Sequence, residues 1–245
     1  MRIRVGLGIL LAMAASNARA ELPTHSFGLH LGGVATRPQE LNTLVAQYKT
    51  ALNLDATALG PAVRYGGFYD WRFDESWSFG LGYSRMMAST DGSSANGSLN
   101  LQAATQLFGL RAHYDAWTLG EVRVGFLATG GVILANTVTA INLFGTAQGV
   151  EASALGPLAS LAVTGAFSLS PQLSVEAEVG YQYARTGILK VKSDENTTFD
   201  AGDPYTSGNT SLRVNSSGLF MAFGIRYLLG AESGGGAEIP GIPGL

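Results

Sequence analysis

Hydrophobic and polar residues alternate with a period of two along most of the chain after residue 25. In residues 174–184 (SVEAEVGYQYA), Val175 and Val179 share one face of a predicted strand, and Glu176 and Glu178 share the other. Seven further segments alternate in the same way, so the pattern predicts eight strands and an all-β fold. The segments are residues 26–32, 62–73, 77–84, 108–115, 121–129, 160–168, 174–184 and 221–227.

The predicted connections between these strands alternate between short and long. Residues 74–75, 116–120 and 169–171 are short turns, whereas 36–60, 88–99, 136–156 and 186–217 are longer. Short turns at one end and long loops at the other are typical of outer-membrane barrels, and an even strand number leaves both termini at the short-turn end. We therefore predict an eight-stranded antiparallel up-and-down transmembrane β-barrel with short periplasmic turns and long extracellular loops.

The two faces of the predicted strands differ in composition. One face carries most of the aromatic and large aliphatic residues, and the other carries Gly, Ser, Ala, Thr and the charged residues. A soluble lipocalin-like barrel or sandwich would bury the apolar face, whereas a membrane barrel turns it to lipid. We favour the membrane barrel, because a surface rich in Gly and Ala suits water poorly. The aromatic girdle expected at the short-turn end comprises Trp71, Phe73, Trp77, Tyr114, Trp117 and Tyr227.

The polar face supplies charged residues to the predicted lumen. Side chains just fill the interior of an eight-stranded barrel, and a buried unpaired charge is costly. We therefore predict an ion-paired network near the short turns, in which Glu176 and Glu178 face arginines such as Arg226 and, across the lumen, Arg123. A plug is favoured over an ion-selective path. The ten residues are Arg64, Asp70, Arg72, Arg111, Asp115, Glu121, Arg123, Glu176, Glu178 and Arg226.

The two ends of the chain differ from the predicted barrel. Residues 1–20 combine Arg2 and Arg4, an apolar run and a small-x-small site, which predicts a cleaved signal peptide and export to the bacterial outer membrane. The run is too short for a spanning helix. The expected organisation is therefore a signal peptide at 1–20, the barrel domain at 21–230 and a flexible Gly/Pro-rich periplasmic tail at 231–245.

Composition excludes several kinds of chemistry. Only 13% of the residues are charged and the net charge is −3, which argues against a nucleic-acid partner. The chain has no cysteine, so thiolate metal sites, disulfides and cysteine nucleophiles are absent. His113 and Asp115 share one strand face, but no serine stands out as a nucleophile. We predict no catalytic residue, no cofactor and no metal site.

The longer loops carry weaker signals. Residues 38–56 repeat apolar residues at helical spacing, which predicts an amphipathic helix with a capping box from Thr36 to Gln39. Residues 88–99 suggest a mobile polar hairpin, and 136–156 a protruding hairpin that turns near Gly145. Residues 186–217 are interpreted as a solvated loop, whose acidic residues Asp194, Glu195, Asp200 and Asp203 do not have EF-hand spacing.

The stretches YGGFYDWRFDESWSFGLGYSR and LSPQLSVEAEVGYQYA look like strand–tight turn–strand units. With the signal peptide and the eight segments, they resemble the small outer-membrane barrels of the OmpA transmembrane domain, OmpX, OmpW and opacity-protein type. Many of these proteins end on an aromatic residue, whereas here 18 residues follow Tyr227. The resemblance implies the fold and leaves function open.

Three functions remain open at this point. The favoured one is a non-enzymatic outer-membrane barrel with a plugged polar lumen and surface loops for structural or binding roles. The alternatives are a porin-like passage for small or apolar solutes and a lipid-modifying enzyme of the outer membrane. The expected partners are outer-membrane lipid and lipopolysaccharide and the barrel-assembly machinery, and the surface ligand is unknown.

Overall fold

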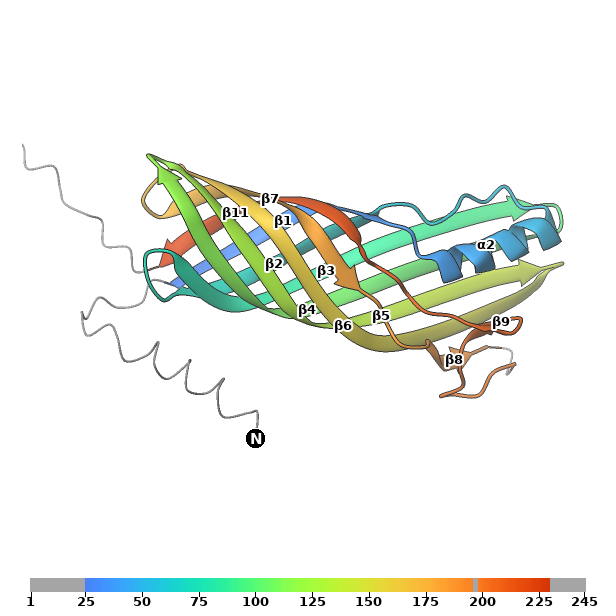
Figure 1. The fold of residues 1–245 in the computed structure, drawn as a ribbon. Coiled ribbons are helices and arrows are strands. Elements are labelled where there is room, and N and C mark those ends of the chain that lie inside the picture. The colour runs from blue at the N-terminus through green and yellow to red at the C-terminus, as the bar shows by residue number, and fades with distance from the viewer. Residues whose placement is uncertain (1–24, 196–197, 230–245) are drawn as a thin grey trace, which may run out of the picture.

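The computed structural model describes residues 25–195 and 198–229, so the predicted signal peptide and the tail lie outside the described residues. Eight antiparallel strands form a closed barrel (Figure 1), in which the first and the last strand pair in register over twelve residues. The order around the ring is β1-β2-β3-β4-β5-β6-β7-β11. The bounds are β1 His25–Thr36, β2 Ala62–Arg72, β3 Trp77–Ser94, β4 Gly97–Leu119, β5 Val122–Leu143, β6 Thr146–Ser168, β7 Leu173–Ala184 and β11 Gly218–Leu229.

Three tight turns close one end of the barrel, as the sequence predicts. The Asp74 carboxylate accepts hydrogen bonds from the backbone N–H groups of Ser76 and Trp77, which fixes the turn between β2 and β3. Gly120 adopts a φ of 59° in the turn between β4 and β5. The first and last described residues also lie at this end (Figure 1). The short-turn end is therefore rigidly defined by local turn chemistry.

The barrel strands have two lengths. Strands β1, β2, β7 and β11 contain 11 or 12 residues, whereas β3 contains 18 and β4, β5 and β6 contain 22 or 23. The hairpin predicted at 88–99 is present, and it is part of two long strands, because β3 continues to Ser94 and β4 begins at Gly97. The predicted hairpin is confirmed: β5 and β6 turn at Phe144 and Gly145. Four strands therefore extend past the others as a curved sheet (Figure 1).

The predicted amphipathic helix is confirmed as α2 (Gln39–Leu52), with Leu41, Leu44, Val45 and Leu52 buried. The predicted capping box is wrong. Pro38 is the N-cap residue, and Thr36 ends β1, where its hydroxyl donates to the carbonyl of Asn215 at 2.9 Å. Asn53, in the left-handed conformation, ends the helix. Among the described residues, no helix is long and apolar enough to cross a membrane.

The chain between β7 and β11 adds a strand to the extended sheet and contributes side chains to the core beside it. It contains β8 (Lys190–Asp194), which pairs with β6, and the short β9 (Thr206–Ser207) and β10 (Thr210–Ser211). Much of the predicted solvated loop, residues 190–195 and 198–211, is exposed, but Leu189, Tyr205 and Leu212 are at most 3% exposed. These side chains join α2 and the extended strands in one apolar core. We call residues 37–61, 88–105, 135–154 and 185–217 the cap.

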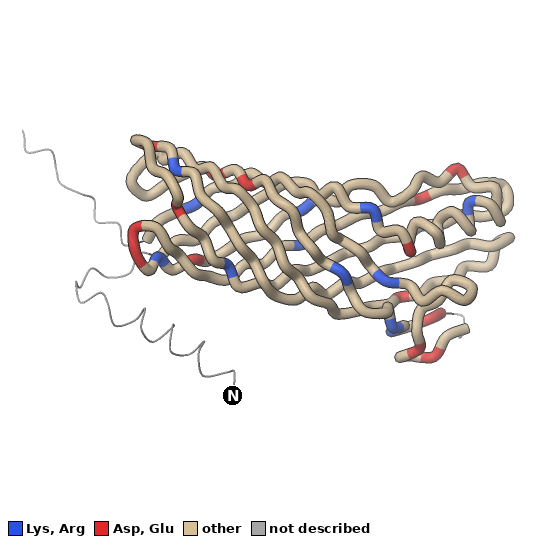
Figure 2. Tube along the Cα trace, in the orientation of Figure 1, with Lys and Arg blue, Asp and Glu red and all other residues tan. Residues whose placement is uncertain are grey.

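The direction of the apolar side chains changes between the barrel and the cap. On the outer face of the barrel, large aliphatic side chains are exposed; Leu29, Leu110 and Leu161 are 60% to 71% exposed. In the cap, apolar side chains such as Leu101 and Ile141 point inward instead. Only the barrel part therefore presents the apolar band that a bilayer requires, and the cap is organised like a water-soluble protein. Charged positions are few and scattered along the barrel (Figure 2).

Candidate functional site

A buried carboxylate on β2 occupies the centre of the lumen. Asp70 is 1% exposed and accepts a hydrogen bond from Arg111 Nε at 3.3 Å, and its Oδ2 lies 3.5 Å from Arg226 Nη2. Glycines make room for these long side chains. A Cβ at Gly80, which pairs with Asp70, would collide with the Asp70 side chain, and one at Gly82 would lie 2.9 Å from Arg111 Cδ. Small inward residues on β3 thus position the network.

The two glutamates of the SVEAEVGYQYA strand point into the lumen. Glu176 Oε1 lies 2.7 Å from Nε of Arg226 on the neighbouring β11, and Glu178 Oε1 lies 3.6 Å from Nη2 of Arg111. Both glutamates are buried, with at most 8% of their surface exposed. Together with Asp70, three buried carboxylates therefore surround two guanidinium groups in the lumen.

An aromatic ring inside this network was missed by the sequence analysis. Phe68 on β2 points inward and is 7% exposed. The guanidinium carbons of Arg111 and Arg226 lie 4.1 Å and 5.1 Å from its ring centroid, at cation–π distance. The available signal was its position two residues before Asp70, on the polar face of the strand.

A second ionic cluster lies closer to the short turns. Asp115 Oδ2 contacts Arg72 Nη2 at 2.9 Å and Arg123 Nη1 at 3.8 Å. Among the described residues, the carboxylate within 4.0 Å of Arg123 is therefore that of Asp115, and the predicted contact of Arg123 with the glutamates is not an ion pair at this distance. His113 Nδ1 is 3.8 Å from Asp115 Oδ1, and its Nε2 lies 2.9 Å from Thr164 Oγ1.

The order of groups in this cluster, carboxylate–imidazole–hydroxyl, is that of a catalytic triad. Its setting differs from that of an active site in two ways. His113 and Thr164 are buried, and the Asp115 carboxylate is shared with two arginines. The Asp115 carboxylate is therefore engaged by arginines as well as by the imidazole.

Two predicted members of the network have other environments. Glu121 is exposed in the turn between β4 and β5, because β4 continues to Leu119, so the prediction that it faces the lumen is wrong. Arg64 does lie in the lumen, but among the described residues no carboxylate lies within 4.0 Å of it. Its Nε donates to Ser84 Oγ at 3.3 Å, and its guanidinium carbon lies 4.6 Å from the ring centroid of Phe220.

A small polar cavity adjoins Arg64 near the middle of the barrel. It measures about 20 Å³, and His30, Arg111 and Gln182 also line it. His30 Nε2 lies 2.9 Å from Ser84 Oγ, while His30 Nδ1 and Gln182 Oε1 are buried without a hydrogen-bond partner in the described part of the chain. A cavity of this volume has room for about one water molecule.

Apolar side chains fill the lumen between this cavity and the cap. Met86, Leu107 and Ile133 are at most 3% exposed and belong to one cluster that crosses the barrel. The cap core, centred on α2, lies beyond it. The lumen thus contains an ionic layer, an apolar layer and the cap in succession. The apolar cluster comprises Val34, Ala62, Met86, Leu107, Leu127, Ile133, Leu158, Ala162, Ala184 and Phe220.

The predicted girdle residues lie on the outer surface at the short-turn end. Trp77 is in ring contact with Tyr114 at 4.8 Å, and Trp71 with Phe73 at 6.2 Å. A β-bulge between Asp115 and Trp117 leaves Trp117 65% exposed. Tyr227 pairs with Phe27 at 5.5 Å. These contacts form the aromatic belt expected at a membrane interface.

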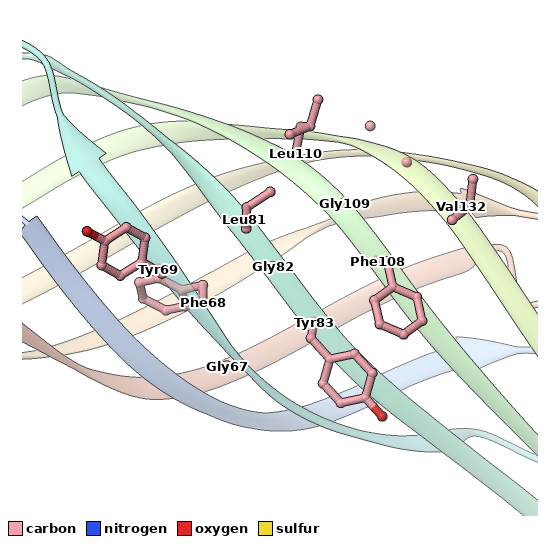
Figure 3. Close-up of a pocket in the computed structure, with 12 residues that line it drawn as sticks. Gly67, Phe68, Tyr69, Leu81, Gly82, Tyr83, Phe108, Gly109, Leu110 and Val132 are labelled. Carbon is pink, nitrogen blue, oxygen red and sulfur yellow. The ribbon is translucent and has the colours of Figure 1, made fainter.

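The outer wall also contains a shallow hollow (Figure 3). Tyr69, Leu81, Tyr83, Phe108 and Leu110 surround it, and glycine backbone forms its floor. Its volume is about 530 Å³. Because the hollow lies within the apolar band, we interpret it as part of the lipid-facing surface.

No protein-family model and no curated protein matches the chain. Similar solved structures include the outer membrane protein OprG from Pseudomonas aeruginosa, at 10% identity and a TM-score of 0.48 over 85% of this chain and 97% of that chain. A major outer membrane protein from Thermus thermophilus is 13% identical, with a TM-score of 0.48 over 84% and 99%. Neisserial surface protein A is 13% identical, with a TM-score of 0.41 over 84% and 99%. The likeness concerns the barrel fold alone.

Proposed function

We propose that this chain is a non-enzymatic barrel of the bacterial outer membrane that anchors the cap at the cell surface. In this proposal the short turns lie in the periplasm and the cap lies outside the cell. The apolar band contacts outer-membrane lipid, including lipopolysaccharide in the outer leaflet. The barrel-assembly machinery inserts the chain. The role of the cap is structural or ligand-binding.

The filled lumen is the observation that carries this proposal. Buried ion pairs around Asp70 occupy one layer, and a cluster around Ile133 occupies the next. The cavity beside Arg64, about 20 Å³, is too small for a solute path. Above it, α2 packs its apolar face into the cap core. A continuous aqueous passage would require all three layers to rearrange.

Border residues support the placement of the cap in water. On β3, the outward side chains change from Tyr83, which is 38% exposed, to Arg85. On β7, Tyr183 is followed two residues later by Arg185, which pairs with Glu40 at 3.3 Å. Tyrosine followed by arginine is the order expected where the hydrocarbon layer gives way to charged headgroups.

Planar-bilayer recording tests the sealed lumen. Purified protein, shown to be folded by its heat-modifiable gel migration, should give no conductance steps. Steps that require the folded protein, and that vanish after boiling, would refute the proposal and establish the passage. The enzymatic alternative has a separate test. An altered acyl pattern in the lipids of expressing cells, abolished by His113→Ala, would contradict the non-enzymatic assignment.

A further inference from the structure

The cap contains a pocket that the sealed barrel does not explain. It measures about 360 Å³ and lies between α2, the β5–β6 hairpin and residues 194, 198–199 and 205–208. Leu44, Ile141, Val150 and Tyr205 form a floor in which each side chain is at most 9% exposed. The volume is within the range of small-molecule sites. In Figure 1, α2 and the segment with β8 and β9 lie at the same end of the molecule.

Two aromatic side chains line this pocket above the floor. Tyr48 projects from α2, one turn after Leu44, on the helix face that lines the pocket. Phe199 belongs to the loop after β8 and makes an edge-to-face contact with Tyr205, with a centroid distance of 5.8 Å and an angle of 89°. Asp194 Oδ2 accepts a hydrogen bond from the backbone N–H of Phe199 at 2.9 Å, which connects Phe199 to the end of β8.

The remaining side chains that line the pocket include polar groups, none of which is positively charged among the described lining residues. They are the side-chain amides of Gln47 and Gln148, the carboxylate of Asp194, and the hydroxyls of Thr198 and Ser207. The Ser207 hydroxyl donates to Gln47 Oε1, which joins α2 to β9 beside the pocket. The described lining residues include no Lys, Arg or His. Phosphate, sulfate and carboxylate ligands therefore meet no complementary charge here.

We propose that this pocket binds a neutral saccharide. The apolar face of a pyranose ring packs on aromatic side chains such as Tyr48 and Phe199. Its hydroxyls pair with side-chain amides, which both donate and accept hydrogen bonds, and with a carboxylate, which accepts them. Burial raises the pKa of Tyr48 and raises the pKa of Tyr205 to about 12, so both phenols remain neutral. The inference deepens the proposed function, since it assigns a ligand class to the cap and rests on its exposure at the cell surface.

Calorimetric titration of the full-length folded protein tests this inference. The micelle must be a zwitterionic or amine-oxide detergent, because maltoside and glucoside headgroups are themselves saccharides. The probes are glucose, galactose, N-acetylglucosamine, maltose and lactose, each up to about 10 mM, a range that captures weak single-site binding. Ethanolamine and glucose 6-sulfate serve as the cationic and anionic comparisons. We expect at least one neutral sugar to bind and neither comparison to do so.

Substitutions then locate the site. Tyr48→Leu keeps an apolar side chain but removes the aromatic ring, and should weaken binding on the order of tenfold. Gln148→Ala should weaken it several-fold through a lost hydrogen bond. The matched control is Gln102→Ala, which removes an exposed amide on β4 outside this pocket and should leave binding unchanged. All variants should retain heat-modifiable migration.

Several results would overturn the inference. They are no binding of any neutral sugar, binding that Tyr48→Leu and Gln148→Ala leave unchanged, or binding of ethanolamine alone. Lipopolysaccharide with and without a neutral O-polysaccharide distinguishes a ligand of the cell's own envelope from a foreign glycan. These failures differ from failure of the proposed function, because a chain that binds no sugar and shows no conductance is still a sealed anchor.

Discussion

The ionic centre of the lumen gives the sharpest prediction about stability. Asp70→Asn removes a negative charge that faces Arg111 and Arg226, whose side chains are 3% and 5% exposed. Removing one partner of a buried ion pair costs about 3–5 kcal/mol. Glu178 still lies beside Arg111 and Glu176 beside Arg226. We therefore expect the low end of this range, a loss of about 3 kcal/mol in the free energy of unfolding.

Urea titration of the barrel in lipid vesicles measures this loss. Unfolding and refolding are followed by the fluorescence of the tryptophans and by heat-modifiable migration. The parent and Asp70→Asn should have equal m-values. Asp91→Asn is the matched control, because Asp91 is an exposed carboxylate in the part of β3 that belongs to the cap. It should change stability by less than about 0.5 kcal/mol. Equal free energies for Asp70→Asn and Asp91→Asn would refute the pairing.

Three further predictions address the cap, the packing of the wall and the pH dependence. Leu41→Ala removes a side chain that is 0% exposed in the cap core. The cap should lose about 2–5 kcal/mol of stability, so proteases should cleave within residues 37–61 while heat-modifiable migration of the barrel persists. Unchanged resistance to proteases would contradict the cap core. Gly80→Ala places a Cβ against the carbonyl of Tyr69 and should lower the folded fraction after refolding. A Cβ at Gly130 would have no atom within 4 Å, so Gly130→Ala should refold like the parent. Equal folded fractions for the two variants would count against the packing. Burial raises the pKa of Tyr205 from 10.0 to about 12, so the stability that comes from its neutral phenol is full below pH 10 and is lost as the pH rises toward 12. The difference in phenolate absorbance between the parent and Tyr205→Phe should show one group that titrates near pH 12, and titration near pH 10 would contradict its burial.

The alternation of side chains was sufficient to predict the barrel but only part of the cap. Period-two patterning reports a strand with two different faces, and lipid outside a narrow lumen makes that difference large. Beyond Tyr83 the outer surroundings change from lipid to water, so the apolar face of the same strands moves inside. Residues 88–99 were therefore interpreted as a mobile polar hairpin separate from the barrel strands, although they continue β3 and β4. Local propensity did identify α2, because its apolar spacing is independent of what it packs against.

The lumen shows a similar division between local and long-range information. The sequence indicated which charges face inward, because facing follows from position in a strand. It did not indicate which charges meet, because contacts across the barrel depend on strand stagger. Glu178 thus faces Arg111, and Arg123 meets Asp115. Glu121 was placed in the lumen because the turn was predicted at residues 116–120. In the structure β4 continues to Leu119 and β5 begins at Val122, so Glu121 lies in the turn.

Labelling at two positions of one strand tests the central claim that lipid faces the barrel and water faces the cap. The chain has no cysteine, so a single introduced thiol carries the only label. Phe126 and Val138 both lie on β5, and their side chains are 47% and 42% exposed. A fluorophore at Phe126→Cys should be quenched by lipid-borne nitroxide, and one at Val138→Cys by a water-soluble quencher. A label at position 126 that neither quencher reaches, or one at position 138 that only lipid quenches, would contradict the account.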